Sequence, residues 1–164
     1  MNFSKKIMSP LGSLYLVANK NALISLDNQT SDLYKLAILS ESHPVLNLSE
    51  IQLNEYFDQK RFEFDIPIEL KGTPFQLKVW NALKLIPHGK VWSYGEQANY
   101  IKTPKAYRAV GAANGKNPLP IIIPCHRVIG TTGKLVGFSG GIEMKIELLK
   151  HEGHQIDGLQ LIQN

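Results

Sequence analysis

The stretch Ile121-Ile122-Ile123-Pro124-Cys125-His126-Arg127-Val128-Ile129 decides how the rest of the chain is interpreted. An isoleucine-rich run of this length is typical of a buried strand, so we expect a strand here. The run contains the only cysteine of the 164 residues, followed directly by His126. A free cysteine commonly serves as a small buried packing residue, and this alternative stays open beside a nucleophilic role for Cys125.

Composition places the chain among ordinary soluble globular proteins. Its residues are 43% hydrophobic and 20% charged, and 164 residues suit one large domain or two small ones. No apolar run approaches the roughly 20 residues of a membrane span, and the N-terminus lacks the features of a signal peptide. A single cysteine excludes an internal disulfide and zinc sites built on several cysteines, which indicates a reducing, cytoplasmic location.

Charge is unevenly distributed along the chain. Residues 1–70 carry six Lys+Arg and nine Asp+Glu, whereas residues 71–164 carry twelve and five. The net charges of −3 and +7 add up to the overall +4. An acidic half joined to a basic half predicts that the C-terminal part meets a polyanion, although an uneven but idle surface would look the same.

The first seventy residues predict a small α+β unit without a chemical constellation. Alternating apolar residues on both sides of Asn19-Lys20-Asn21 indicate a hairpin. The other predicted elements are a short helix capped by Ser31 or Asp32, a helix through residues 51–57, and a half-buried strand over residues 62–68.

The boundary is predicted at Lys71-Gly72, giving domains 1–71 and 72–164. Thr73 and Ser93 each open a capping box, so a helix should follow each of them. A further helix from Thr103-Pro104 to about residue 113 completes a pair that resembles a helix-turn-helix. A last helix is predicted from residue 142 to about residue 152.

If Cys125 is a nucleophile, it needs a base and a group that orients the base. His126 is the obvious base, but neighbours in an extended strand point to opposite faces, so contact requires a turn or a bridging water. Glu152 is a candidate orienting group, because a carboxylate at the end of a helix opposes the helix dipole; a solvated helix end is the alternative. From spacing alone, a Cys-His hydrolase and an alkyl acceptor cannot be distinguished.

The segment Pro124-Cys125-His126-Arg127-Val128 resembles the signature of the O6-alkylguanine-DNA alkyltransferases (methylated-DNA–protein-cysteine methyltransferases). The resemblance extends in the family's order over nearly all of residues 72–153. It includes the segments 72–76, 93–94, 108–111, 117–118, 139–141 and 151–153. It implies an α+β protein with a small ribonuclease H-like α/β domain and a mostly helical C-terminal domain containing a helix-turn-helix.

The resemblance also implies the catalytic residues. Cys125 would accept the alkyl group irreversibly, and His126 would deprotonate it through a water molecule while Glu152 holds His126. Tyr94 would offer its hydroxyl to the departing guanine, and Lys145 would support the site. Each molecule would act once and would need no cofactor or metal.

The implied partner is double-stranded DNA containing O6-alkylguanine, or less well O4-alkylthymine, with the base flipped out from the minor groove. Arg108 would fill the vacated stack. The other DNA-binding residues would be Ser93, Ala106, Tyr107, Ala109, Gly111 and Asn117. The base pocket would be formed by Val128, Phe138, Ser139 and Gly140. The protein would be a monomer in solution, able to assemble cooperatively on DNA and associated with the nucleoid in a prokaryote.

Two positions depart from the family pattern. Tyr107 stands where many relatives carry a small residue, and Phe138 where some carry tyrosine. The main alternative function is a non-catalytic, alkyltransferase-like lesion-binding protein, but such proteins carry another residue at the cysteine position. A Cys-His hydrolase fits a basic helix-turn-helix half poorly.

Overall fold

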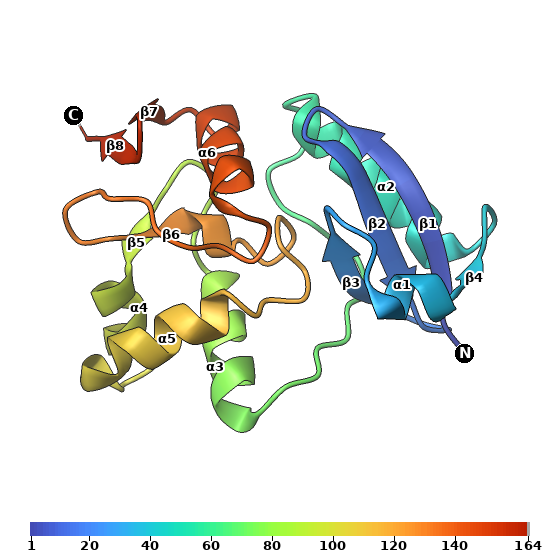
Figure 1. Ribbon diagram of the computed structural model, residues 1–164, viewed down its shortest axis with the longest axis horizontal. Helices are drawn as coiled ribbons and strands as arrows, with labels where there is room; N and C mark the ends of the chain where they lie inside the picture. Colours follow the sequence, from blue (N-terminus) through green and yellow to red (C-terminus); the bar gives the residue numbers. More distant parts are fainter. Residues whose placement is uncertain (164) are drawn as a thin grey trace. The chain divides into compact units, whose positions relative to one another are not determined.

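A computed structural model describes residues 1–163 and divides the chain into two compact units. Unit 1 spans Met1–Leu70 and unit 2 begins at Lys71, one residue before the boundary placed from the sequence. Unit 1 contains most of the strand residues, and unit 2 is mainly helical (Figure 1). The predicted mixed α+β class is therefore confirmed.

Unit 1 is built on a four-stranded sheet. Its strands are β1 (Phe3–Ser9), β2 (Gly12–Ala18), β3 (Leu23–Asp27) and β4 (Ile38–Leu39), in the spatial order β3-β2-β1-β4. β1–β2 and β2–β3 are antiparallel, whereas β1–β4 is parallel. The predicted hairpin corresponds to β2–β3 and is confirmed, and β1 is an addition that pairs along its whole length with β2.

Two helices complete unit 1. The short α1 (Asp32–Leu36) is capped by Ser31, as predicted, and α2 (Pro44–Phe57) packs against the sheet. The predicted strand over residues 62–68 is wrong: its sheet pairing is a single bridge between Leu23 and Ile68. Part of the reason is that the Gln52 side chain bonds both the N–H and the C=O of Asp65, so these groups are satisfied without a neighbouring strand.

Unit 2 begins with three helices that position the rest. They are α3 (Pro74–Leu83), α4 (Tyr94–Tyr100) and α5 (Tyr107–Asn114), the last preceded by a 3₁₀ turn at Pro104–Ala106. Both predicted capping boxes are present, at Thr73 and Ser93. α4 and α5 pack together as the two helices of the predicted pair.

Buried polar side chains fix the position of α5. Gln97 on α4 and Asn114 on α5 exchange two amide hydrogen bonds of 3.0 and 2.7 Å. The indole N–H of Trp80 on α3 donates to the Ala113 carbonyl at 2.8 Å. All these groups are buried, so each bond also satisfies groups that water does not reach.

The cysteine stretch does not form the predicted long strand. Cys125–Arg127 is a 3₁₀ turn, and only Val128–Ile129 (β6) is extended, pairing in parallel with β5 (Trp92–Ser93). Ile121 has a φ of 76°, a conformation that interrupts any strand and is strained for a β-branched residue. Ile121 and Ile123 are buried, but they lie outside any strand.

The chain closes with α6 (Ile142–His151), whose C-cap is Glu152, and a hairpin of β7 (Gln155–Asp157) and β8 (Gln160–Ile162). The sequence pattern did not predict this hairpin. Ile129, Leu135, Leu149 and Leu161 form a buried apolar cluster that joins β6, α6 and β8. The hairpin is the red segment before the C-terminus in Figure 1.

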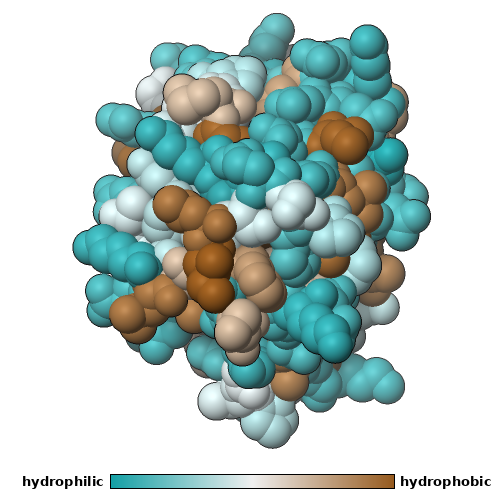
Figure 2. All heavy atoms as spheres, turned by 90° about the vertical axis from the view of Figure 1, so that its right-hand side faces the viewer, coloured by the Kyte–Doolittle hydropathy of each residue, from teal (hydrophilic) through white to brown (hydrophobic). Residues whose placement is uncertain are grey.

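The surface is mixed in polarity. In the view of Figure 2, apolar side chains form several separate patches among hydrophilic ones. The most exposed large apolar residues of unit 1 after Met1 are Leu36, Leu39 and Met8. Within residues 1–163, no helix is both long and apolar enough to cross a membrane.

Candidate active site

The thiol of Cys125 lies at the start of the 3₁₀ turn and is only 3% exposed. Its Sγ atom is 3.9 Å from the hydroxyl oxygen of Ser139. Burial raises the pKa of Cys125, and interactions with Asn117, Ser139 and Lys145 partly offset this rise. Reaction as a thiolate therefore requires a base that removes the proton inside the protein.

His126 is fully buried and bonded to Glu152. Its Nε2 atom lies 2.7 Å from Oε2 of Glu152. Its Nδ1 atom is also buried and has no hydrogen-bond partner among the described residues. The predicted pair is thus brought together across 26 residues of sequence, and one ring nitrogen is left free to serve another group.

Arg127 is the residue that sequence reasoning missed. Its Nε donates to Oε1 of Glu152 at 2.8 Å and its Nη2 to Oε2 at 3.0 Å, a two-pronged ion pair. Its Nη1 donates to the carbonyl of Ile86 at 2.7 Å, which anchors the pair to the end of the α3 region. A cation inside an apolar run is the signal that could have revealed it.

The side chains of His126, Arg127 and Glu152 determine one another's charge states. Burial alone would raise the pKa of Glu152, but its bonds to His126 and Arg127 hold that pKa well below its usual range. Burial lowers the pKa of His126, and the nearby charge of Arg127 lowers it further, against the opposing effect of Glu152. The carboxylate is therefore ionised, Arg127 balances its charge, and the imidazole stays neutral and able to accept a proton.

Lys145 on α6 is fully buried. Its Nζ donates to the carbonyls of Val128 at 2.6 Å and Val136 at 3.2 Å, and to the hydroxyl of Tyr94 at 3.5 Å. Burial lowers the pKa of Lys145 to about 8. Burial likewise raises the pKa of Tyr94 to about 12, so its hydroxyl keeps its proton at neutral pH.

A cavity of about 360 Å³ opens beside Tyr94. The Tyr94 and Phe138 side chains, both predicted site residues, take part in its lining. Its full lining is Tyr94, Tyr107, Gly111, Gly115, Val136, Gly137 and Phe138. The centres of the Phe138 and His126 rings are 6.4 Å apart and the rings meet edge-to-face, which links the cavity wall to the buried imidazole.

Other predicted residues surround this group. Asn117 donates to the Ile123 carbonyl at 2.7 Å and accepts from the Leu119 N–H at 2.9 Å, so it fixes the loop that leads to the thiol. A Cβ on Gly111 would lie 3.7 Å from the Tyr94 ring, and Gly140 is packed against Phe138 and Met144.

The remaining DNA-binding candidates lie at or near α5, outside the hydrogen-bonded group. Arg108 is exposed, with its guanidinium 5.8 Å from the centre of the Tyr107 ring. Ala106, Tyr107 and Ala109 are at the start of the same helix, and Ser93 caps α4. In residues 1–163, no group of three or more His, Cys, Asp or Glu side chains could hold a metal ion.

The site combines a buried thiol with a hydrogen-bonded His126–Glu152–Arg127 group, in an α+β chain of two compact units with paired helices. Two family descriptions match the chain: "6-O-methylguanine DNA methyltransferase, ribonuclease-like domain" over residues 3–70 and "6-O-methylguanine DNA methyltransferase, DNA binding domain" over residues 74–154. A methylated-DNA–protein-cysteine methyltransferase of Mycobacterium leprae is 43% identical over 150 residues, 90% of each chain. An inducible one of Bacillus subtilis is 44% identical, over 89% of this chain and 82% of the relative.

Solved structures agree. The crystal structure of Mycobacterium tuberculosis OGT in complex with DNA has a TM-score of 0.85, with 45% identity over 92% of both chains. That of the Mycobacterium tuberculosis O6-methylguanine methyltransferase has a TM-score of 0.86, with 42% identity over 93% of both. The chain therefore belongs to the 6-O-methylguanine DNA methyltransferase family. It is a methyltransferase of DNA repair, and the resemblance found in the sequence is confirmed.

Proposed function

We propose that Cys125 accepts the alkyl group from O6 of a guanine in duplex DNA, and that each molecule does so once. The observation that carries the proposal is the 2.7 Å bond between His126 and Glu152 directly beside the chain's only thiol. It supplies the oriented base that a buried thiol needs. O4-alkylthymine presents the same kind of alkyl ether and is the secondary substrate.

The thiol proton leaves through His126. The free Nδ1 atom of the neutral imidazole takes it by way of one water molecule, and Glu152 stabilises the imidazolium that results. The thiolate attacks the alkyl carbon, a carbon–sulfur bond forms and the bond from that carbon to O6 breaks. The 3₁₀ turn supports this relay because it brings the two neighbouring side chains out of strand geometry.

The departing guanine receives a proton from Tyr94. At a pKa of about 12 the Tyr94 hydroxyl is protonated and able to donate, and Lys145 stands 3.5 Å behind it to restore the proton. The Val128 carbonyl oxygen already accepts one hydrogen bond from Lys145, and its second lone pair accepts a hydrogen bond from the guanine base. The product is a thioether, which water does not cleave, so the reaction is stoichiometric and uses no cofactor.

The base reaches the thiol by leaving the duplex, at a cost of a few kcal/mol of unstacking. Arg108, exposed on α5, enters the stack in its place from the minor groove. Ala106, Ala109 and Gly111 permit close approach of the helix, while Tyr107 adds an aromatic wall to the cavity. Ser93 and Asn117 hold α4 and the active-site loop, and Phe138, Ser139 and Gly140 cover the base. The protein acts as a monomer that can assemble cooperatively on DNA.

Mass spectrometry after mixing with O6-methylguanine duplex tests the proposal. The expected result is one added methyl group on the peptide that contains Cys125, and at most one per molecule. Multiple turnover, or an unmodified Cys125 with the lesion repaired, would contradict it. Cys125→Ser is the control that should remain unmodified.

The role of Arg108 is tested in the same assay by comparing duplex with a free base as substrate. Arg108→Ala should slow repair of duplex but leave the reaction with free O6-benzylguanine nearly unchanged, because only duplex requires flipping. Arg61→Ala, which removes the same charge from unit 1, is the matched control. Equal losses on both substrates would reject the role proposed for Arg108.

A further inference from the structure

The β7–β8 hairpin lies beyond the residues that the family descriptions match, which end at residue 154. It nevertheless holds residues 132–135, which follow the active-site strand β6, by hydrogen bonds; we call these bonds the grip and residues 132–135 the gripped segment. The Leu135 N–H donates to the Leu159 carbonyl at 2.7 Å, and the Leu161 N–H donates to the Gly133 carbonyl at 2.8 Å. The Gln160 side chain donates to the Thr132 carbonyl as a third bond. The hairpin thus supplies three hydrogen bonds to residues 132–135.

Packing reinforces this grip. Leu161 is 3% exposed and belongs to the buried cluster that contains Leu135. Gly133 has a φ of 87°, and a Cβ there would lie 2.6 Å from the Gln160 amide nitrogen and 2.9 Å from the Leu161 carbonyl oxygen. The two segments therefore meet at a distance that only glycine allows.

The gripped segment leads directly into the wall of the cavity. Leu135, the last gripped residue, is followed by Val136, Gly137 and Phe138, all of which line the 360 Å³ cavity. The Val136 carbonyl accepts from Lys145 at 3.2 Å, which ties the wall to the group beside the thiol. A displacement of Leu135 would thus be transmitted to the wall through one peptide bond.

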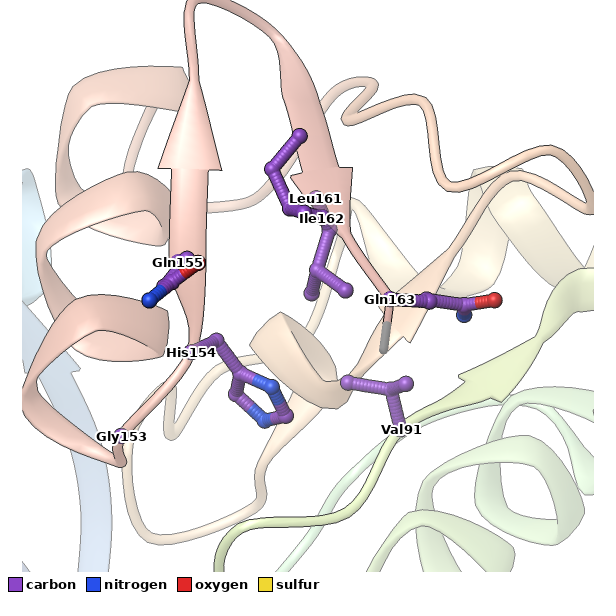
Figure 3. A pocket seen from close by; sticks show the side chains of 7 residues that line it. All are labelled: Val91, Gly153, His154, Gln155, Leu161, Ile162 and Gln163. Atoms are coloured by element: carbon purple, nitrogen blue, oxygen red, sulfur yellow. The ribbon is translucent and has the colours of Figure 1, made fainter.

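The hairpin is less firmly supported on another side. A cavity of about 410 Å³ lies there, lined by Val91, Gly153, His154, Gln155, Leu161, Ile162 and Gln163 (Figure 3). The His154 ring, Val91 and Ile162 project into this space (Figure 3). Ile162 is 42% exposed, in contrast to the buried Leu161 beside it. On the opposite strand of the hairpin, Ile156 of β7 packs against the apolar cluster that contains Leu161. The bonds to residues 132–135 and this packing therefore support the hairpin.

We propose that the β7–β8 hairpin is a positioning element that fixes the cavity wall at Val136–Phe138 and thereby limits the size of the alkyl group accepted. The proposal rests on the proposed function, because it takes the 360 Å³ cavity as the place of the base and its alkyl group. The hairpin touches no reacting atom and acts through residues 132–135. The hairpin therefore affects which sizes of alkyl group are accepted, and it does not affect proton transfer.

Two matched pairs of variants test the role of the hairpin in the whole 164-residue chain. Leu161→Ala and Gln160→Ala weaken the grip, whereas Ile162→Ala and Gln163→Ala remove similar side chains from neighbouring positions outside it. Alkylation rates are measured by mass spectrometry with free O6-methylguanine and free O6-benzylguanine. The benzyl-to-methyl rate ratio should rise about three- to tenfold in the first pair, since pocket contacts of this size discriminate about 10–200-fold. The ratio of the second pair should match that of the unaltered protein.

The pH dependence of the methyl reaction is the second measurement. It should be the same for all four variants and the unaltered protein, because the relay does not include the hairpin. A benzyl-to-methyl ratio that stays constant while thermal stability falls would overturn the proposal and leave the hairpin a structural support only. A ratio that changes together with the pH profile would also overturn it. Failure of the unaltered protein to gain any alkyl mass would instead contradict the proposed function.

Discussion

In the proposed relay, Arg127 influences the charge state of His126, the base. An isolated carboxylate beside His126 would favour the imidazolium, which cannot accept the thiol proton. The guanidinium forms two bonds with that carboxylate and repels positive charge on the ring. Burial is the main reason that the pKa of His126 is lowered, and the Arg127 charge lowers it further against the effect of Glu152. The neutral imidazole therefore depends on burial and on both charged neighbours.

Replacement of this guanidinium should change the pH dependence of alkylation. In Arg127→Met the pKa of His126 should rise, because Glu152 then faces the ring without a counter-charge. The reaction requires neutral His126, so the acidic limb of the rate profile should move to higher pH. The measurement is the rate with free O6-benzylguanine between about pH 5 and 9, a range that spans the ordinary pKa of histidine.

Two further variants make this result interpretable. Arg127→Lys keeps the positive charge but not the two-bond geometry of the guanidinium, so its acidic limb should stay near that of the unaltered protein. This variant keeps the test informative if Arg127→Met fails to fold, because breaking a buried ion pair costs about 3–5 kcal/mol. Arg61→Met is the control for charge loss elsewhere. An acidic limb that does not move in Arg127→Met would show that the guanidinium does not set the pKa of His126.

At the scale of elements, local signals were read correctly from the sequence. The capping boxes at Thr73 and Ser93 each involve four consecutive residues, and both are present. Strands were harder, because pairing depends on distant partners. The run at residues 121–129 is apolar enough for a strand, but Ile121 takes a positive φ and Asn117 bonds the Ile123 carbonyl. Neither constraint is visible in the hydrophobic pattern.

The site shows the same limit. The Cys125, His126 and Glu152 group followed from chemistry and family resemblance, and the structure brings the last two within 2.7 Å. The bonds of Arg127 and the carbonyl partners of Lys145 could not be inferred, because they depend on backbone groups of Ile86, Val128 and Val136. Spacing in the sequence carries no information about which carbonyls turn inward.

The amide pair between α4 and α5 leads to a prediction about stability. Gln97→Met leaves the buried Asn114 side chain without its partner, so the free energy of unfolding should fall by about 1–3 kcal/mol. The double variant Gln97→Met/Asn114→Leu should recover part of that loss, because no polar group is then stranded. Urea unfolding of both single variants and the double variant measures this coupling. Strictly additive losses would show that the pair does not fasten the two helices.

Over the whole molecule, charge is separated between the units. Residues 71–164 carry a net charge of +7 and residues 1–70 carry −3. A basic domain that contacts phosphates releases bound counterions from DNA, and this makes its affinity depend on salt. This asymmetry can be counted from the sequence alone, because the net charge of a segment does not depend on how the segment folds.

The affinity of the protein for undamaged duplex should therefore fall linearly with salt on a double-logarithmic plot. Fluorescence anisotropy with a labelled duplex between about 50 and 200 mM salt gives the slope, which counts the phosphates neutralised. Lys105→Ala, in the turn before α5, should reduce that slope by about one, whereas Lys20→Ala in unit 1 should not change it. An affinity independent of salt would contradict electrostatic recognition.

The single buried cysteine has a practical consequence. Because Cys125 is the only thiol in the chain, any thiol-specific reagent reports on that one atom without further engineering. Because the Cys125 residue is only 3% exposed, labelling requires the surrounding wall to open. The labelling rate thus measures how often the site opens in the absence of DNA. Molecules whose Cys125 is already alkylated give no labelling signal.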